Sequence, residues 1–264
     1  MSARDNIVIN NSIDQDILTA LTSDPDVTLD VTDFDLRRLP QDIRAKLYTT
    51  GPSFDAPQLR TSGSIYAIYA TNFNAPELQS SGDIDVGSAT NFVAPRLQTS
   101  GYINAGSATS FSMPELQTAG FINVPSATFF YAPQLQTAGS IYARRATSFT
   151  VPKLRIAETV YADRVLNFDA PQLQTVGDVH ALRTTSFNTP ELQIAGLIDV
   201  PNATYFNAPR LQIVGDIITK NMTNFGGSQF RIVSNAYTLS ATTSVSGRPD
   251  DAAPDPPQAE SLAP

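Results

Sequence analysis

The chain has 264 residues, of which 41% are hydrophobic and 16% charged, with a formal net charge of −8 and no cysteine. This composition excludes a highly charged disordered chain, and no run of about 18 apolar residues predicts a membrane span. The negative charge and the lack of a Lys/Arg-rich run argue against nucleic acid as a partner, and the lack of cysteine excludes disulfides and Cys-based zinc sites.

The N-terminal residues MSARDNIVINNSIDQDIL show no basic segment followed by an uninterrupted apolar segment. That pattern is the mark of a Sec signal peptide. We therefore expect a cytoplasmic protein, or one secreted by a route that uses no Sec signal peptide.

Residues 1–50 are predicted to form an N-terminal cap of mixed α/β structure. A short amphipathic helix is expected over Ile13–Leu21, a strand over Val27–Val31, and a helix beginning with proline over Pro40–Leu47. A cap is needed because a stack of parallel strands exposes an unpaired edge at each end.

Residues 51–225 contain nine copies of a 19-residue unit without insertions. The unit reads F-x-A-P-x-L-Q-T-x-G-x-I-x-A-x-x-A-T-x, as in Phe73–Asn91. Its phenylalanines mark the starts of coils one to nine: Phe54, Phe73, Phe92, Phe111, Phe130, Phe149, Phe168, Phe187 and Phe206. A fixed short period of this kind is typical of a solenoid.

Within each unit, G-x-I-x-A and F-x-A alternate apolar and other residues, which predicts two short strands with one buried face. Proline and glycine leave no span long enough for a helix. We therefore predict an all-β fold, a parallel β-solenoid whose Phe, Leu and Ile columns fill the interior. The glycine column is expected at a corner with positive φ or at a close approach between coils. Glutamines of one column, which runs from Gln79 to Gln212 and is interrupted by Arg155, could form amide ladders along the stack.

The C-terminal part is predicted to contain a cap over residues 226–241 and a disordered acidic tail over residues 242–264. Within the cap, Gln229–Val233 and Ala236–Ser240 have the composition of closing strands. The tail is rich in Ser, Pro, Asp and Ala and has almost no large apolar residue.

The phrase P-x-L-x-T-x-G-x-I, followed by apolar-x-A-P at the next turn, resembles short leucine-rich units of surface proteins. Similar units occur in the receptor L-domain, in related fungal cell-surface proteins and in bacterial BspA-like surface proteins. The resemblance covers Phe54 to Phe225. It implies a solenoid used for recognition and transfers no catalytic residue.

Catalytic candidates are few, so we predict no enzyme, no cofactor and no metal site. His180 is the only histidine, and it occupies an outward position of its strand. Asp83 and Asp85 flank Ile84 and should both point outward, as acid pairs do in carbohydrate-active parallel β-helices. The following coils do not repeat the pair, which favours an ordinary solvated surface.

The sixth coil departs most from the unit, with Glu158 in place of glycine, Val165-Leu166 in place of Ala-Thr, and Arg155-Ile156 in place of Gln-Thr. Basic and aromatic residues gather at outward positions in and beside it, an arrangement favoured in partner binding. They are Arg144, Arg145, Arg164, Arg183, Tyr142 and Tyr161. Alternatively, Glu158 and Asp163 pair with these arginines in a surface network.

A second candidate surface consists of outward aromatic residues. Phe121, Phe129 and Tyr131 occupy positions that hold Ser, Asn or Asp in other coils, and they lie in one coil and its junction. Neighbouring exposed aromatics can form a partner patch.

We therefore expect a protein-binding solenoid, such as a secreted effector or an adaptor, with its site around coils five to seven. A carbohydrate-active parallel β-helix is the enzyme alternative, and carbohydrate stays open as a ligand. A structural, self-assembling or ice-binding solenoid is a further alternative, the last because threonine columns such as Thr71, Thr90 and Thr109 follow the coils. The sequence leaves the oligomeric state open.

Overall fold

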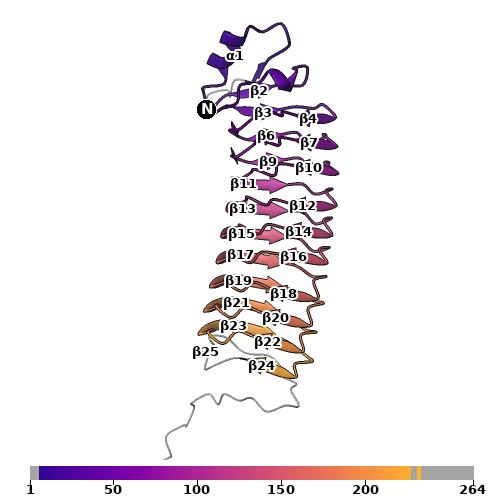
Figure 1. Ribbon diagram of the computed structural model, residues 1–264, viewed down its shortest axis with the longest axis vertical. Coiled ribbons are helices and arrows are strands. Elements are labelled where there is room, and N and C mark those ends of the chain that lie inside the picture. Colours follow the sequence, from indigo (N-terminus) through magenta and orange to yellow (C-terminus); the bar gives the residue numbers. More distant parts are fainter. Residues whose placement is uncertain (1–5, 227–230, 233–264) are drawn as a thin grey trace, which may run out of the picture.

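The computed structural model describes residues 6–226 and 231–232, and it is a rod of stacked coils (Figure 1). Every strand pair is parallel, and residues paired across strands of the repeat are 19 positions apart, as Ile103 and Ile122 are. The predicted all-β parallel β-solenoid is thus confirmed. It has about twelve turns of roughly 19 residues instead of nine, because strands from residues 6–50 join the same large sheet.

The large sheet is the continuous spine of the rod and has 15 strands. Its main path runs through β1 (Asn6–Val8), β2 (Thr28–Asp30), β3 (Lys46–Tyr48), β6 (Ile65–Tyr66), β9 (Ile84–Asp85), β11 (Thr99–Asn104), β13 (Thr118–Asn123), β15 (Thr137–Tyr142), β17 (Ile156–Tyr161), β19 (Thr175–His180), β21 (Ile194–Asp199), β23 (Ile213–Ile218) and β25 (Arg231–Ile232). Beside this path, β5 (Thr61–Ser62) pairs with β8 (Ser80–Ser81), which also pairs with β11.

The phenylalanine-bearing strands form three smaller sheets on another side of the rod (Figure 1). The first contains β4 (Ser53–Asp55), β7 (Asn72–Asn74) and β10 (Asn91–Val93). The second contains β12 (Ser110–Ser112), β14 (Phe129–Tyr131) and β16 (Ser148–Thr150). The third contains β18 (Asn167–Asp169), β20 (Ser186–Asn188), β22 (Tyr205–Asn207) and β24 (Asn224–Gly226).

The core is a set of buried columns that run along the rod. Phenylalanine rings stack one per coil, with centroids 5.1 Å apart between Phe54 and Phe73 and 5.0 Å apart between Phe111 and Phe130. The leucine and isoleucine columns are buried beside them, and alanines fill the narrow positions. Burial of a large apolar side chain contributes about 2 kcal/mol, so these columns supply most of the driving force for folding.

Two seams separate the three smaller sheets. Across the first, the rings of Phe92 and Phe111 lie 6.1 Å apart, and across the second, those of Phe149 and Phe168 lie 5.8 Å apart. A larger buried residue replaces alanine beside each seam, Met113 at the first and Val151 at the second. At each seam the neighbouring strands, β10 and β12 or β16 and β18, belong to different sheets.

The glycine column lies at a close approach between coils. None of the glycines in the described part of the chain has φ in the left-handed region. A Cβ at Gly196 would lie 2.6 Å from the Gly177 carbonyl oxygen, and one at Gly215 would lie 2.7 Å from that of Gly196. The second of the two expected roles for these glycines is therefore correct.

Amide ladders are present, but asparagine forms them. Asn104 Nδ2 donates to Asp85 Oδ1 at 2.8 Å, and Asn123 Nδ2 donates to Asn104 Oδ1 at 3.0 Å. The predicted glutamine ladder is wrong for the described residues, where no side-chain hydrogen bond joins two glutamines of that column. Its glutamines stack through the backbone, as where Gln98 N donates to the Gln79 carbonyl.

The N-terminal region contains α1 (Gln15–Leu21), capped by Asp14, and a 3-10 turn over Leu36–Arg38. The expected strand is confirmed as β2. The helix expected over Pro40–Leu47 is wrong, because Leu47 pairs with Leu29 on one side and Ile65 on the other as part of the large sheet.

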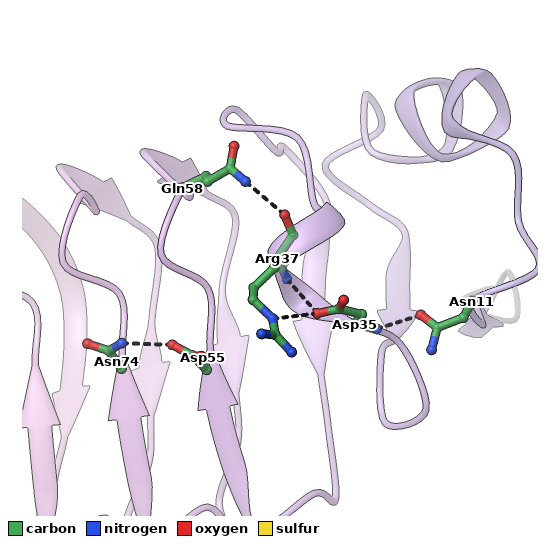
Figure 2. Close-up of polar contacts among 6 residues, drawn as sticks. All are labelled: Asn11, Asp35, Arg37, Asp55, Gln58 and Asn74. Atoms are coloured by element: carbon green, nitrogen blue, oxygen red, sulfur yellow. Dashed lines mark hydrogen bonds and ion pairs between the residues drawn. The ribbon is translucent and has the colours of Figure 1, made fainter.

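Side chains tie this region to the first coil of the repeat (Figure 2). The Gln58 Nε2 donates to the Arg37 carbonyl at 2.9 Å, and the Asp35 carboxylate accepts from Arg37 Nε at 3.0 Å. Asp35 N in turn donates to Asn11 Oδ1 at 2.7 Å. Backbone pairing and these contacts together make residues 6–50 continuous with the stack.

At the C-terminal end, β25 places Arg231 and Ile232 beside β23. The rest of the predicted strand over Gln229–Val233, the predicted strand over Ala236–Ser240 and the predicted tail over residues 242–264 lie outside the described residues. Within the described part, no helix is long and apolar enough to cross a membrane.

Candidate functional site

Three successive tight turns carry the basic residues of coils five to seven. Each turn follows a buried alanine of the large sheet and is closed by a backbone hydrogen bond, such as Ala146 N to the Ala143 carbonyl at 3.0 Å. The two central residues of these turns are exposed, except for the half-buried Asp163. They are Arg144-Arg145 in the first turn, Asp163-Arg164 in the second and Leu182-Arg183 in the third.

Arg145, Arg164 and Arg183 form a row of exposed guanidinium groups, 19 residues apart in sequence and about 4.8 Å apart per turn along the axis. Arg183 N donates to the Asp163 carbonyl at 3.0 Å, which keeps successive turns in register. We call Arg144, Arg145, Arg164 and Arg183 the arginine corner.

The expected pairing of these arginines with Glu158 and Asp163 is present only in part. Arg144 Nε lies 3.9 Å from Asp163 Oδ2, and its guanidinium lies 4.4 Å from the centroid of the Tyr161 ring. Among the described residues, Arg145, Arg164 and Arg183 form no ion pair, and neither does Glu158. Three of the four guanidiniums therefore stay available to a partner.

Asp163 is a largely buried carboxylate beside the corner, with its side chain 21% exposed, and Asp199, which lies beside His180, is 20% exposed. The Asp163 Oδ1 atom is buried without a hydrogen bond. Burial raises the pKa of this carboxyl above its ordinary value, and the nearby charges of Arg144 and His180 oppose that rise. Its charge balances Arg144 and leaves the other three arginines uncompensated.

An aromatic ladder lies beside the arginine corner on the outer face of the large sheet, and its rings are half-buried. Its members, in order along the rod, are Tyr102, Phe121, Tyr142, Tyr161 and His180. Neighbouring centroids are 4.5–5.3 Å apart, and the Tyr161 and His180 rings are inclined by only 3°. His180 Nδ1 also lies 3.5 Å from Asp199 Oδ2. Because the faces cover one another, the ladder presents ring edges to solvent.

The structure separates the three residues of the second candidate surface. Phe121 lies on β13 and stacks with Tyr142 at 5.1 Å, so it belongs to the aromatic ladder. Phe129 and Tyr131 lie on β14 in a different sheet, with centroids 5.9 Å apart, and Phe129 is 40% exposed. Adjacency in sequence did not translate into one surface, because the chain turns between the two strands.

Two exposed leucines flank the arginine corner and were not among the expected site residues. Leu182 is 39% exposed and shares a turn with Arg183, while Leu166 is 58% exposed and follows Arg164 by two residues. Leu166 stands where most coils have threonine, and Leu182 follows Arg144 and Asp163 in one column. Column-by-column comparison of the repeat would have found both.

The acids considered for carbohydrate chemistry make internal bonds. Asp83 Oδ1 accepts from Tyr102 N at 2.9 Å, and Asp85 Oδ1 accepts from Asn104 Nδ2 at 2.8 Å. Asp178 lies in the same column as Asp83, and its Oδ1 likewise accepts from Leu197 N at 2.9 Å. These bonds stitch one coil to the next. Within residues 6–226 and 231–232 no cluster of three His, Cys, Asp or Glu side chains is placed to hold a metal.

The threonine column that contains Thr71, Thr90 and Thr204 also bonds internally. Thr90 Oγ1 donates to the Thr71 carbonyl at 3.2 Å, and Thr204 Oγ1 donates to the Thr185 carbonyl at the same distance. Their hydroxyl protons are committed to the preceding coil. This geometry does not favour a threonine face that orders water as ice.

No family model, curated protein or solved structure that was compared with the chain matches it. The solenoid implied by the resemblance to surface-protein repeats is present. The comparisons do not extend that resemblance to membership of the L-domain or BspA-like families.

Proposed function

We propose that the chain is a protein-binding solenoid whose arginine corner receives an acidic segment of a partner protein. One observation carries the proposal: Arg145, Arg164 and Arg183 lie in one column of consecutive turns and form no ion pair among the described residues. Like charges at such spacing repel one another. An anionic ligand relieves this repulsion and gains charge-assisted hydrogen bonds.

The surroundings of the corner favour a peptide over a small ion. Leu166 and Leu182 offer exposed apolar surface, and the Arg144 guanidinium lies over the Tyr142 and Tyr161 rings. Arginine and tyrosine are enriched at the centres of protein interfaces. A segment that combines Asp or Glu with aliphatic side chains matches both features. The resemblance of the repeat to recognition solenoids of cell-surface proteins supports the same function.

Carbohydrate receives less support from the aromatic ladder. Sugars stack on the open faces of aromatic rings, whereas the faces between Tyr142, Tyr161 and His180 cover one another at 4.5 Å. Asp83 and Asp85 also each use one carboxylate oxygen to accept a hydrogen bond from the next coil.

The test is selection from a displayed library of random peptides against the purified chain. We expect the enriched peptides to be rich in Asp, Glu and Leu, and to lose binding when Arg145, Arg164 and Arg183 are changed to glutamate. Binding should also weaken as salt rises, because these charges are exposed.

A matched control carries the same charge change elsewhere, in the variant Arg60→Glu, Lys153→Glu, Arg155→Glu, whose three parent residues are exposed. Circular dichroism checks that both variants are folded. Peptides that bind the corner variant as well as wild type, or a selection that enriches no acidic peptide, would rule out the proposed interface.

A further inference from the structure

The N-terminal end of the rod has the opposite charge to the arginine corner. Residues 6–50 contain eight aspartates against four basic residues, Arg37, Arg38, Arg44 and Lys46, a balance of −4. Four of these aspartates are exposed at α1 and the turn after it, and within the described residues they form no ion pair: Asp14, Asp16, Asp24 and Asp26. Arg38 donates to the Asn11 and Ile13 carbonyls and Arg37 pairs with Asp35, so these four carboxylates carry the excess negative charge of this end.

An apolar side chain lies within this acidic group. Ile17 of α1 is 55% exposed and follows Asp16 directly in sequence. An exposed aliphatic side chain among carboxylates is the composition that the arginine corner, with Leu166 and Leu182, is suited to bind. Charge complementarity of this kind directs association and fixes its orientation.

The two surfaces of one molecule cannot meet. Along the large sheet, seven strand-to-strand steps separate β2, near α1, from β17 at the centre of the corner. At about 4.8 Å per step these elements lie about 34 Å apart on a continuous stack. Figure 1 shows α1 at one end of the rod, well away from β15, β17 and β19.

We propose that the partner at the arginine corner is a second copy of this chain, docked through Asp16, Ile17 and Asp26 at its N-terminal end. This inference rests on the proposed function of the corner as a binding site for acidic segments. The contact joins two different surfaces, so each added copy exposes a new acidic end and a new corner. Such a heterologous contact extends into an open array instead of closing as a dimer.

The experiment is sedimentation velocity over a concentration series of the full chain, at about 0.05 M and about 0.5 M salt. We expect the mean mass of wild type to rise with concentration at low salt and to fall toward the monomer at high salt. The variant Arg145→Glu, Arg164→Glu, Arg183→Glu should weaken self-association by about tenfold or more. The control variant Arg60→Glu, Lys153→Glu, Arg155→Glu should associate like wild type.

A second variant, Asp16→Lys with Asp26→Lys, tests the acidic end. It keeps Asp14, which caps α1 by accepting from Asp16 N, and Asp24, which accepts from Asp26 N, so the local fold is retained. This variant alone should also stay monomeric. Mixed in equal amounts with the corner variant, it should associate again, because unlike charges then face each other in both contacts.

A wild-type chain that stays monomeric at low salt, or a mixture of the two variants that does not associate, would overturn the second-copy assignment. Neither outcome changes the result of the acidic-peptide selection, which tests the arginine corner independently of self-association. If the corner variant binds acidic peptides as wild type does, the proposed function fails whatever the state of association.

Discussion

The outer face of the large sheet changes character between β13 and β15, although the backbone does not. Up to β13 one column holds the amide ladder of Asp85, Asn104 and Asn123, and from β15 the same column holds the rings of Tyr142 and Tyr161. Asn123 and Tyr142 are direct partners in the parallel register. The buried columns and the glycines thus determine the backbone geometry of the coils, and outward-facing residues can differ without altering it.

The largest effect is expected from substitutions in the buried isoleucine column, which both regions of the sheet share. Ile122 and Ile141 are fully buried beneath the two halves, so Ile122→Ala and Ile141→Ala should each lower the free energy of unfolding by about 2–5 kcal/mol. Denaturant unfolding measures both. A large loss of stability for only one of the two variants would show that the core packing differs between β13 and β15.

The next test compares the two ladders. Tyr161→Ala removes two ring stacks and the contact with the Arg144 guanidinium, and should cost about 2 kcal/mol. Asn104→Ala removes two amide hydrogen bonds that water can partly replace, and should cost about 1 kcal/mol. If Asn104→Ala lowers the free energy of unfolding more than Tyr161→Ala does, the two ladders do not play equivalent roles on the same backbone.

A smaller, pH-dependent effect is expected at Asp163. Burial raises the pKa of this carboxyl in the folded chain, so the folded state holds the proton more tightly than the unfolded state does. The stability of wild type relative to Asp163→Asn should be greatest below the unfolded pKa of about 4 and should decline as pH rises through the folded pKa. Urea unfolding of both proteins from about pH 3 to about pH 7 measures this decline. A difference that grows with pH contradicts the assignment.

The smallest effect on stability belongs to the arginine corner. Arg145→Gln, Arg164→Gln and Arg183→Gln together remove repulsion among exposed like charges, so the free energy of unfolding should rise by a few tenths of a kcal/mol at low salt. The gain should vanish at high salt. Thermal unfolding at two salt concentrations measures it, and a clear loss of stability would mean that these arginines hold the coils together.

Much of the fold followed from the sequence because the period of 19 residues repeats without insertion. Strand positions, the buried Phe, Leu and Ile columns and the close approach at glycine all follow from such a period. The three N-terminal turns were not predicted, because β1, β2 and β3 lack the Phe-Pro signature and their spacing is irregular. Leu47, expected in a helix, is buried in the stack and pairs with Leu29 and Ile65, each 18 residues away.

The candidate site was predictable to the extent that it follows columns. Tyr142, Tyr161 and the row of Arg145, Arg164 and Arg183 lie as the register requires. Contacts between columns were not predictable, because they depend on side-chain rotamers. Phe121 reaches Tyr142 from a neighbouring column, and Arg144 rather than its neighbour lies over the Tyr161 ring.

The seams beside Phe92 and Phe149 give the rod a direction in which it yields. A force that bends the rod so as to open the side of the smaller sheets parts β10 from β12, or β16 from β18, without breaking strand pairing. The opposite bend must break backbone hydrogen bonds of the continuous sheet. The rod is therefore stiff along the large sheet and bends most easily at the two seams. Val151 lies at the second seam, in the sixth coil, which also contains Arg164. Bending at this seam therefore changes the spacing of the guanidinium groups of the arginine corner.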